Sequence, residues 1–324
     1  MKGWISNARG MGGLQFGELA DPIAKAGEII VEVRAAALNF SDILMIDDAY
    51  QVKPPRPFTP GQEVAGVVVS APELSRWRPG DRVATKVNWG GFAERVAVPA
   101  DMPIALPDAI GFARAAAIPV SYTTAIVALS ECSTVRPGAT VLVHAAAGAV
   151  GLAAVQYAAA NGATVIATAG SDEKARFCEE LGAERGINYH DEDFVTILKA
   201  EGGADLILDM VGGPYLPRNI KALADDGRLV QIAFLQGPKV ELNFAEVMMR
   251  RLTITGSTLR PQSDQAKAAI AREVETHVWP MIARGALRVV IDSTFALTEA
   301  PAAHWRLESS GHIGKIVLRV GAGG

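Results

Sequence analysis

Residues 140–151 read TVLVHAAAGAVG, an apolar run that ends in a turn of small residues and continues into a second apolar segment. This order predicts a strand, a tight turn and a helix. A helix N-terminus presents unpaired backbone N–H groups and a partial positive charge, so a pyrophosphate binds there when no side chain blocks its approach. Gly148 and Gly151 match the last two glycines of the dinucleotide-binding pattern G-x-G-x-x-G, but Ala146 replaces the first, so the turn alone is a weak match. The residues predicted to hold the pyrophosphate are Ala146, Gly148, Ala149, Val150 and Gly151.

The composition restricts the class of protein. A chain of 324 residues allows one large or two ordinary domains with a substantial core. The 31 Lys and Arg residues are interspersed with 35 Asp and Glu residues, which argues against a nucleic-acid or membrane partner. Two cysteines are too few for a disulfide framework, and the N-terminal MKGWISNARG lacks the apolar core of a signal peptide. We therefore expect a soluble, cytoplasmic protein.

Residues 139–160 carry no charge and are long enough to mimic a membrane span. The segment divides, however, into a β-branched half and an alanine-rich half. A buried strand and helix of an α/β protein give the same composition. We expect the strand and the helix.

The first 110 residues predict a mainly β unit, because short β-branched segments recur between Pro and Gly. The expected strands are residues 29–34, 64–70, 81–86, 92–98 and 104–106.

From about residue 120, strands alternate with helices, which predicts a parallel, doubly wound sheet with right-handed crossovers. The expected strands are 140–145, 163–169, 186–189, 204–210, 227–234 and 252–257, and the expected helices are 149–161, 172–181, one from residue 193, one near 216–223 and one near 244–250. A long helix should then run to about residue 284, followed by strands at 289–295 and 315–320. Such a β tail most economically rejoins the first unit. The fold class is therefore α/β, with a Rossmann domain at 121–261 inserted in a discontinuous, mainly β domain formed by 1–120 and 262–324.

The end of the second strand of this Rossmann domain indicates which dinucleotide binds. An NAD site expects a carboxylate there for the ribose 2′-hydroxyl, but the strand ends in Ala169, Gly170 and Ser171. Ser171 and Lys174 offer a hydroxyl and a cation to a 2′-phosphate, which favours NADPH. Alternatively, Ser171 caps the next helix, whose first-turn Asp172 and Glu173 complement the dipole or face the ribose of NAD.

Segments along nearly the whole chain resemble the medium-chain dehydrogenase/reductase superfamily, and within it the zinc-free quinone oxidoreductases related to the p53-inducible oxidoreductase and zeta-crystallin. They are AAALNFSD (35–42), PGQEVAGVV (60–68), RPGDRV (78–83), AAAIPVSYTTA (115–125), VLVHAAAGAVG (141–151), TAGSDEK (168–174), LGA (181–183), INY (187–189) and HIGKIVL (312–318). The resemblance implies a GroES-like catalytic domain and a Rossmann domain, an active site in the cleft between them and a homodimer.

The resemblance also bears on zinc. Zinc-dependent relatives place ligands at the positions of Asn39, Gln62 and Val120, none of which has a zinc-binding side chain here. Glu63 remains but cannot hold a tetrahedral site alone. We expect no metal.

The remaining soft ligands do not form a site in the sequence. Cys132 and Cys178 are expected to be buried helix residues. His144 is expected at the edge of the core, and His304 and His312 have no metal-like spacing and should be packed or solvated.

The resemblance implies catalytic roles near the end of the strand at 29–34 and beyond. Asn39 and Tyr50 occupy positions that donate hydrogen bonds to the acceptor, with Asp42 helping to hold Asn39. Ser41 stands where zinc relatives have a proton-relay hydroxyl, but no role is assigned to it. Asn39 and Asp42 could instead satisfy backbone groups of a turn, and Tyr50 could anchor the loop.

Two further cofactor contacts follow from the resemblance. Thr124 resembles a threonine on the nicotinamide side of the cofactor, and otherwise would cap the following helix. Tyr189 resembles a tyrosine near the adenosine phosphate, and otherwise is one more strand aromatic.

The expected reaction is hydride transfer from NADPH to a quinone or a conjugated enone. Such acceptors are already electrophilic, so positioning and hydrogen bonds to the developing oxyanion suffice without a Lewis acid. The alternatives are an enoyl or alkenal reductase, and a crystallin-like protein that binds NADPH without turnover.

Overall fold

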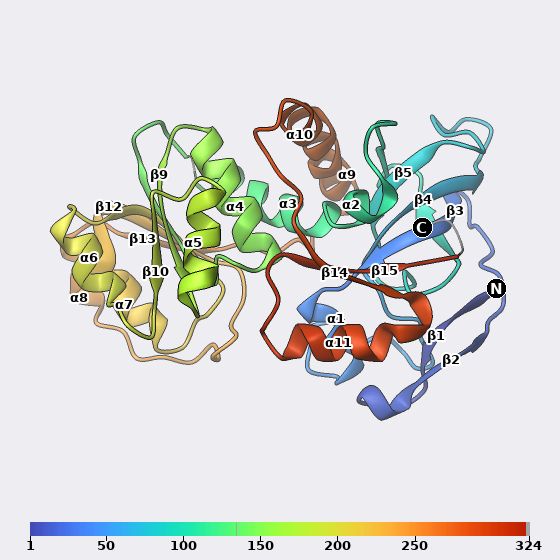
Figure 1. Ribbon diagram of the computed structural model, residues 1–324, viewed down its shortest axis with the longest axis horizontal. Helices are drawn as coiled ribbons and strands as arrows, with labels where there is room; N and C mark the ends of the chain where they lie inside the picture. Colours follow the sequence, from blue (N-terminus) through green and yellow to red (C-terminus); the bar gives the residue numbers. More distant parts are fainter. Residues whose placement is uncertain (134, 322–324) are drawn as a thin grey trace. The chain divides into compact units, whose positions relative to one another are not determined.

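The computed structural model describes residues 1–133 and 135–321. The chain divides into two units (Figure 1). Unit 1 contains residues 1–120, 263–279 and 289–324, and unit 2 contains residues 121–262 and 280–288.

Unit 2 is built on a six-stranded sheet in the order β10-β9-β8-β11-β12-β13, in which every neighbouring pair is parallel. The strands are β8 (Thr140–Val143), β9 (Thr164–Ala169), β10 (Arg185–Asn188), β11 (Ala204–Asp209), β12 (Leu223–Gln231) and β13 (Thr253–Gly256). The connecting helices are α4 (Ala149–Ala160), α5 (Asp172–Glu180), α6 (Phe194–Ala200), α7 (Tyr215–Ala222) and α8 (Phe244–Met249). Counted from β8, this is the 3-2-1-4-5-6 order of a Rossmann domain, which confirms the predicted fold class.

The order of these strands reverses beside β8, where the chain leaves the sheet on one side toward β9 and later returns to the other side at β11. Ligands of doubly wound sheets bind at the carboxyl ends of the strands at such a switch point. The glycine turn that follows β8 lies at this point. Beneath it, Leu142, Ile166 and Ile207 of three adjacent strands are buried in one core.

Unit 1 is built on a seven-stranded sheet in the order β14-β15-β3-β4-β5-β7, with β6 also paired with β3. Its strands are β3 (Glu28–Ala37), β4 (Glu63–Ser70), β5 (Arg82–Lys86), β6 (Arg95–Pro99), β7 (Ile104–Ala105), β14 (Ile291–Ala296) and β15 (Lys315–Arg319), and a separate hairpin comprises β1 (Lys2–Ser6) and β2 (Leu14–Glu18). β15 runs antiparallel to β3, with Val317 opposite Ala37. The red strands β14 and β15 near the C-terminus thus share one sheet with the blue strand β3 (Figure 1), as the β tail predicted.

The helices of unit 1 show what the sequence pattern missed. The predicted long helix is present as α9 (Asp264–Glu273), a π-helical turn η3 (Val274–Val278) and α10 (Trp279–Ala283), the last of which extends into unit 2. The helices α1 (Phe40–Ile46), α2 (Phe112–Ala116) and α11 (Ala300–Glu308) and the hairpin β1–β2 were not predicted. Their short lengths give little periodicity, and tertiary contacts stabilise them.

The remaining elements are short: α3 (Pro119–Ile126), the π-helical turn η2 (Val127–Glu131) and the 3₁₀ turns η1 (Met11–Gly13) and η4 (Leu297–Glu299). Residues 139–160 form β8 and α4 as predicted. In the described part of the chain, no helix has both the length and the apolar character needed to cross a membrane.

Candidate functional site

The two glycines of the turn after β8 have different surroundings. Gly148 is the N-cap of α4 with φ −74° and ψ 165°, a conformation open to any residue. A Cβ atom built on it would meet only Ala145 O, at 3.4 Å. A Cβ atom on Gly151 would lie 2.6 Å from Ala146 Cα. Gly151 therefore lets the first turn of the helix pack against the backbone of the preceding turn, whereas Gly148 leaves the helix N-terminus open to a ligand.

The turn contains one feature that the glycine pattern did not indicate. Ala145, not Ala146, adopts the left-handed conformation, with φ 48°. A non-glycine residue there costs on the order of 1 kcal/mol. Ala146 N–H donates to Thr168 O at 2.9 Å and ties the turn to the end of β9. No sequence signal identifies Ala145, because alanine is not typical of this conformation.

The predicted phosphate-binding residues come together where β9 and β10 end. Ser171 caps α5, because its Oγ accepts a hydrogen bond from Lys174 N–H at 3.3 Å. The Tyr189 hydroxyl lies against Gly170, where an added Cβ atom would be 2.6 Å away. Asp172 accepts a hydrogen bond from Asn188 Nδ2 at 2.9 Å. The capping role is thus present, and it uses the Ser171 oxygen as an acceptor, which leaves the hydroxyl proton to donate to a phosphate.

Thr124 lies within α3 and is half-buried. Because it lies inside this helix, Thr124 does not cap the start of the helix that follows it, which was the alternative. The contact with a nicotinamide stays a prediction.

In unit 1, α1 begins directly after Asn39, which follows β3. Asp42 in the first turn accepts a hydrogen bond from Asn39 N–H at 2.8 Å, so this carboxyl group caps the helix. The Asn39 carboxamide bonds to two side chains from other strands. Its Oδ1 accepts from Lys315 Nζ at 2.7 Å, and its Nδ2 donates to Glu63 Oε1 at 2.9 Å. The Asp42 side chain therefore binds a backbone N–H group, as the alternative expected. The Asn39 side chain instead binds two other side chains.

The partners of Asn39 form a buried ion pair. Lys315 Nζ also contacts Glu63 Oε1, and the second oxygen of Glu63 accepts from Val120 N–H at 2.8 Å. The Glu63 side chain is fully buried and that of Lys315 is 4% exposed. Lys315 was not selected from the sequence, although it lies in the quoted HIGKIVL segment. A charged residue at the start of an apolar strand, KIVLRV, was the available signal.

Asp42 lies beside this pair and is itself fully buried. Burial raises the pKa of its carboxyl group to about 7, although the Asn39 N–H, the Gln62 amide and the Lys315 ammonium favour the charged form. Gln62 Nε2 donates to Asp42 Oδ1 at 3.1 Å and to Ser41 Oγ at 2.5 Å. Ser41 thus belongs to the same hydrogen-bond network.

Tyr50 lies in the loop after α1 and is half-buried, and its backbone N–H donates to Leu44 O at 3.1 Å.

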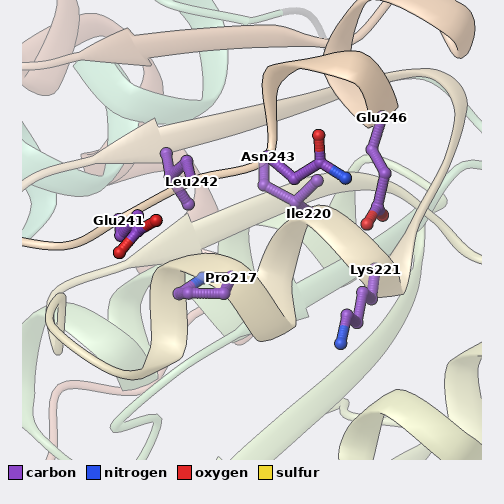
Figure 2. A pocket seen from close by; sticks show the side chains of 7 residues that line it. All are labelled: Pro217, Ile220, Lys221, Glu241, Leu242, Asn243 and Glu246. Carbon is purple, nitrogen blue, oxygen red and sulfur yellow. The ribbon is translucent and has the colours of Figure 1, made fainter.

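One surface pocket of about 730 Å³ lies in unit 2 between α7 and α8 (Figure 2). Its lining residues are Pro217, Ile220, Lys221, Glu241, Leu242, Asn243 and Glu246. None of these is a predicted site residue, and the pocket is distant in sequence from both clusters described above.

The histidines and cysteines correct two expectations. His144 does not lie at the edge of the core, because it is fully buried directly after β8. Cys132 follows η2 and is half-buried, so it is not the buried helix residue that was expected. Cys178 in α5 is buried as predicted, and burial raises the pKa of its thiol to about 12. His304 is packed in α11, where burial lowers its pKa to about 4.

Comparison with known proteins identifies the family. A model of the alcohol dehydrogenase GroES-like domain matches residues 25–108, and a model described as zinc-binding dehydrogenase matches residues 149–274. The quinone oxidoreductase of Sus scrofa is 32% identical over 311 residues, which cover 93% of this chain and 92% of the relative. The chain belongs to the quinone oxidoreductases of the medium-chain dehydrogenase/reductase superfamily.

Solved quinone oxidoreductases share the fold. The enzyme of Thermus thermophilus, whose structures include a complex with NADPH, is 39% identical with a TM-score of 0.85, and the match covers 98% of this chain and 100% of that enzyme. A structure described as an NAD-dependent alcohol dehydrogenase is 31% identical with a TM-score of 0.90, and the match covers 99% of this chain and 100% of that protein. Proteins with this fold therefore differ in their nucleotide.

The family model named for zinc raises the question whether this quinone oxidoreductase could hold the metal. The positions of the zinc ligands carry two amides, Asn39 and Gln62, and the side chain of Val120, which are not zinc ligands. The Lys315 ammonium, bonded to Asn39, would repel a second cation. These residues do not fit a zinc site. Within residues 1–133 and 135–321, no cluster of three or more His, Cys, Asp or Glu residues could hold a metal ion.

Proposed function

We propose that this chain is an NADPH-dependent quinone reductase that works without zinc. The observation that carries the proposal is the open turn at Gly148 followed by a strand end without a carboxylate, in a chain 39% identical to a quinone oxidoreductase with a known NADPH complex. Unit 2 binds the cofactor, and unit 1 supplies the donor to the acceptor.

The residues of unit 2 fit an NADPH molecule. The N–H groups at the start of α4 bind the pyrophosphate, and Gly148 keeps their approach clear. Ser171 and Lys174 bind the 2′-phosphate, and Tyr189 lies beside them against Gly170. Thr124 contacts the nicotinamide side. Bound NADPH supplies the hydride.

Unit 1 contributes the hydrogen bond that the acceptor needs. A quinone gains negative charge on its oxygen as it accepts a hydride, so a fixed N–H donor stabilises the transition state more than the ground state. The Asn39 carboxamide, held by Lys315 and Glu63, is that donor. Tyr50 is a second donor from the adjacent loop. Because a conjugated enone develops the same charge, enoyl or alkenal reduction is the alternative with the same residues.

We also infer that two copies of the chain associate as a homodimer. β13 is the last strand in the order of the unit 2 sheet, and α8, which precedes it, exposes Phe244, Met248 and Met249. An edge strand and an exposed apolar surface are each typical of sites where two chains associate. Sedimentation equilibrium that returned the 34.1 kDa mass of one chain at micromolar concentration would contradict this inference.

The most informative experiment is a spectrophotometric assay of NADPH oxidation with 1,2- and 1,4-quinones, alkenals and enoyl thioesters. We expect the highest kcat/KM with a quinone. A higher value with an alkenal or thioester would favour the enone alternative. Binding of NADPH without turnover of any acceptor would favour the crystallin-like alternative.

Lys174→Ala tests the choice of cofactor. A charge-assisted hydrogen bond to the 2′-phosphate contributes about 1.5–3 kcal/mol, so the ratio of NADPH to NADH affinity should fall about tenfold or more. Lys199→Ala, which removes an exposed lysine at the end of α6, is the matched control and should leave the ratio unchanged. An unchanged ratio in Lys174→Ala would reject the assignment, and fluorescence titration with both nucleotides measures it.

A further inference from the structure

The buried ion pair of unit 1 fixes which way the Asn39 carboxamide points. An amide has an oxygen on one side and an NH₂ group on the other, and a 180° rotation exchanges them. Here the Lys315 ammonium bonds to one side at 2.7 Å and the Glu63 carboxylate to the other at 2.9 Å. The rotated amide would set NH₂ against the ammonium and oxygen against the carboxylate. The charges therefore permit one orientation.

The backbone brings these groups together from distant parts of the sequence. Glu63 begins β4 directly opposite Ala37 of β3, and Asn39 follows two residues later. Lys315 begins β15, the neighbour of β3 on the other side, where Leu38 N–H donates to Ile316 O at 3.0 Å. Three adjacent strands thus present the three side chains at one end of the sheet.

Asn39 is the least buried member of this group. It is 9% exposed, whereas Lys315 is 4% exposed and Glu63 is fully buried. Glu63 takes one of the two hydrogens on Asn39 Nδ2, which leaves the second hydrogen for another acceptor. The ammonium bonded to Asn39 Oδ1 draws electron density from the amide, which makes the N–H a stronger donor.

We propose that Lys315 and Glu63 are positioning residues for the reduction, which orient and polarise the Asn39 amide so that its free N–H binds the acceptor oxygen. The Lys315 ammonium acts through the Asn39 amide. Asn39 stands at the position where zinc-dependent relatives place a metal ligand. The role rests on the proposed function, since the acceptor oxygen is that of a quinone.

The test removes both charges together, because either charge left alone would be uncompensated in the core. The variant Lys315→Met with Glu63→Gln, the charge-pair variant, should retain its fold and its NADPH affinity. Its kcat with a quinone should fall 10- to 100-fold while KM changes less than threefold, because the lost interaction acts in the transition state. The matched control is Arg306→Met with Asp292→Asn, which removes another ion pair of unit 1, with a 2.9 Å N–O distance, and should leave kcat unchanged.

A double-mutant cycle separates positioning from general damage. If Lys315 and Glu63 act through Asn39, the charge-pair variant combined with Asn39→Ala should have the same kcat as Asn39→Ala alone, within twofold. If the combined variant lost kcat by the product of the two separate losses, the proposal would be overturned. A folded charge-pair variant whose kcat stays within threefold of the wild type would also overturn it.

A readout without turnover distinguishes this inference from the proposed function. In protein labelled with [¹⁵N]asparagine, Asn39→Ala identifies the side-chain NH₂ resonances of Asn39. In the wild type, the hydrogen bond to Glu63 should move one of the two proton signals away from the position of a solvated asparagine amide, and in the charge-pair variant both signals should lie near those positions. If the wild type reduces no quinone, the function fails while these signals still decide whether the ion pair holds the amide. Identical signals in both proteins would reject the positioning role.

Discussion

Each unit buries a polar cluster, and the two clusters differ in charge and in access. In unit 2, His144 Nδ1 bonds to Thr168 Oγ1 at 2.9 Å and Nε2 bonds to Asn219 Oδ1 at 2.8 Å. Asn219 Nδ2 donates to Asp209 Oδ2 at 3.0 Å. All four residues are fully buried. In unit 1, the cluster of Lys315, Glu63 and Asn39 contains a cation, and its least buried member, Asn39, is 9% exposed.

The direction of the hydrogen bonds in unit 2 follows from its chemistry. Burial lowers the pKa of His144, so the ring is neutral with one donor and one acceptor nitrogen. Because Asn219 Oδ1 can only accept, Nε2 carries the proton and Nδ1 accepts from the Thr168 hydroxyl. The chain of donors ends on Asp209, which also accepts from Val211 N–H at 2.6 Å. The cluster joins β9 and β11 to α7. Because none of its four side chains is exposed, we expect it to contribute to stability.

Exposure, more than burial of polar groups, distinguishes the cluster for which we propose a role in the reaction from the cluster of unit 2. Both clusters are hydrogen-bonded, and both include a residue just beyond the end of a strand, Asn39 after β3 and His144 after β8. Of the two, the cluster in unit 1 contains a residue that is not fully enclosed, Asn39, which is 9% exposed.

The largest expected effect on stability comes from a substitution that disrupts the cluster of unit 2. Asn219→Leu leaves the His144 N–H without an acceptor and removes a donor from Asp209, which should lower the free energy of unfolding by about 4 kcal/mol. Urea denaturation measures the loss. Asn161→Leu, at the exposed end of α4, is the matched control and should cost less than about 1 kcal/mol. A loss below about 1 kcal/mol for Asn219→Leu would show that the network contributes little.

The two glycines of the β8–α4 turn also differ in their surroundings, since Gly151 is enclosed and Gly148 is open. Gly151→Ala places a methyl group 2.6 Å from the backbone of Ala146 and should cost about 3 kcal/mol of stability. Gly148→Ala meets nothing closer than 3.4 Å, so it should cost about 1 kcal/mol or less while weakening NADPH binding about tenfold or more. Thermal unfolding and fluorescence titration measure the two effects, and equal NADPH affinity in Gly148→Ala and wild type would exclude Gly148 from the phosphate site.

The smallest expected effect concerns the pH dependence of unit 1. The pKa of Asp42 is about 7 in the folded protein against an ordinary value of 3.8, so the folded state keeps a proton that the unfolded chain has released. Stability from this group is present at low pH and is lost as pH rises toward 7. Between pH 5.5 and 7.5 the loss should be about 2 kcal/mol. The difference in unfolding free energy between wild type and Asp42→Asn should change by this amount over the interval, and a constant difference would refute the shift.

Periodicity and turn residues predicted the elements that are long or that repeat. The strands and helices from residue 140 to residue 256 follow the predicted order, because alternating βα units have strong apolar patterns and glycines that mark their ends. The short α1 was missed, although Asn39 and Asp42 at its start are typical helix-capping residues. The predicted site residues that follow β8, β9 and β10 lie at one edge of the sheet, because the carboxyl ends of neighbouring parallel strands meet there.

The sequence by itself determined the family, the Rossmann order and the place of the glycine turn, since these depend on local pattern and on segments such as TVLVHAAAGAVG. The tertiary structure decided which side chains surround Asn39. Lys315 lies 276 residues beyond Asn39 in the chain, and only the pairing of β15 with β3 brings its ammonium to the amide. Contacts between distant strands depend on register and packing, which local spacing does not encode.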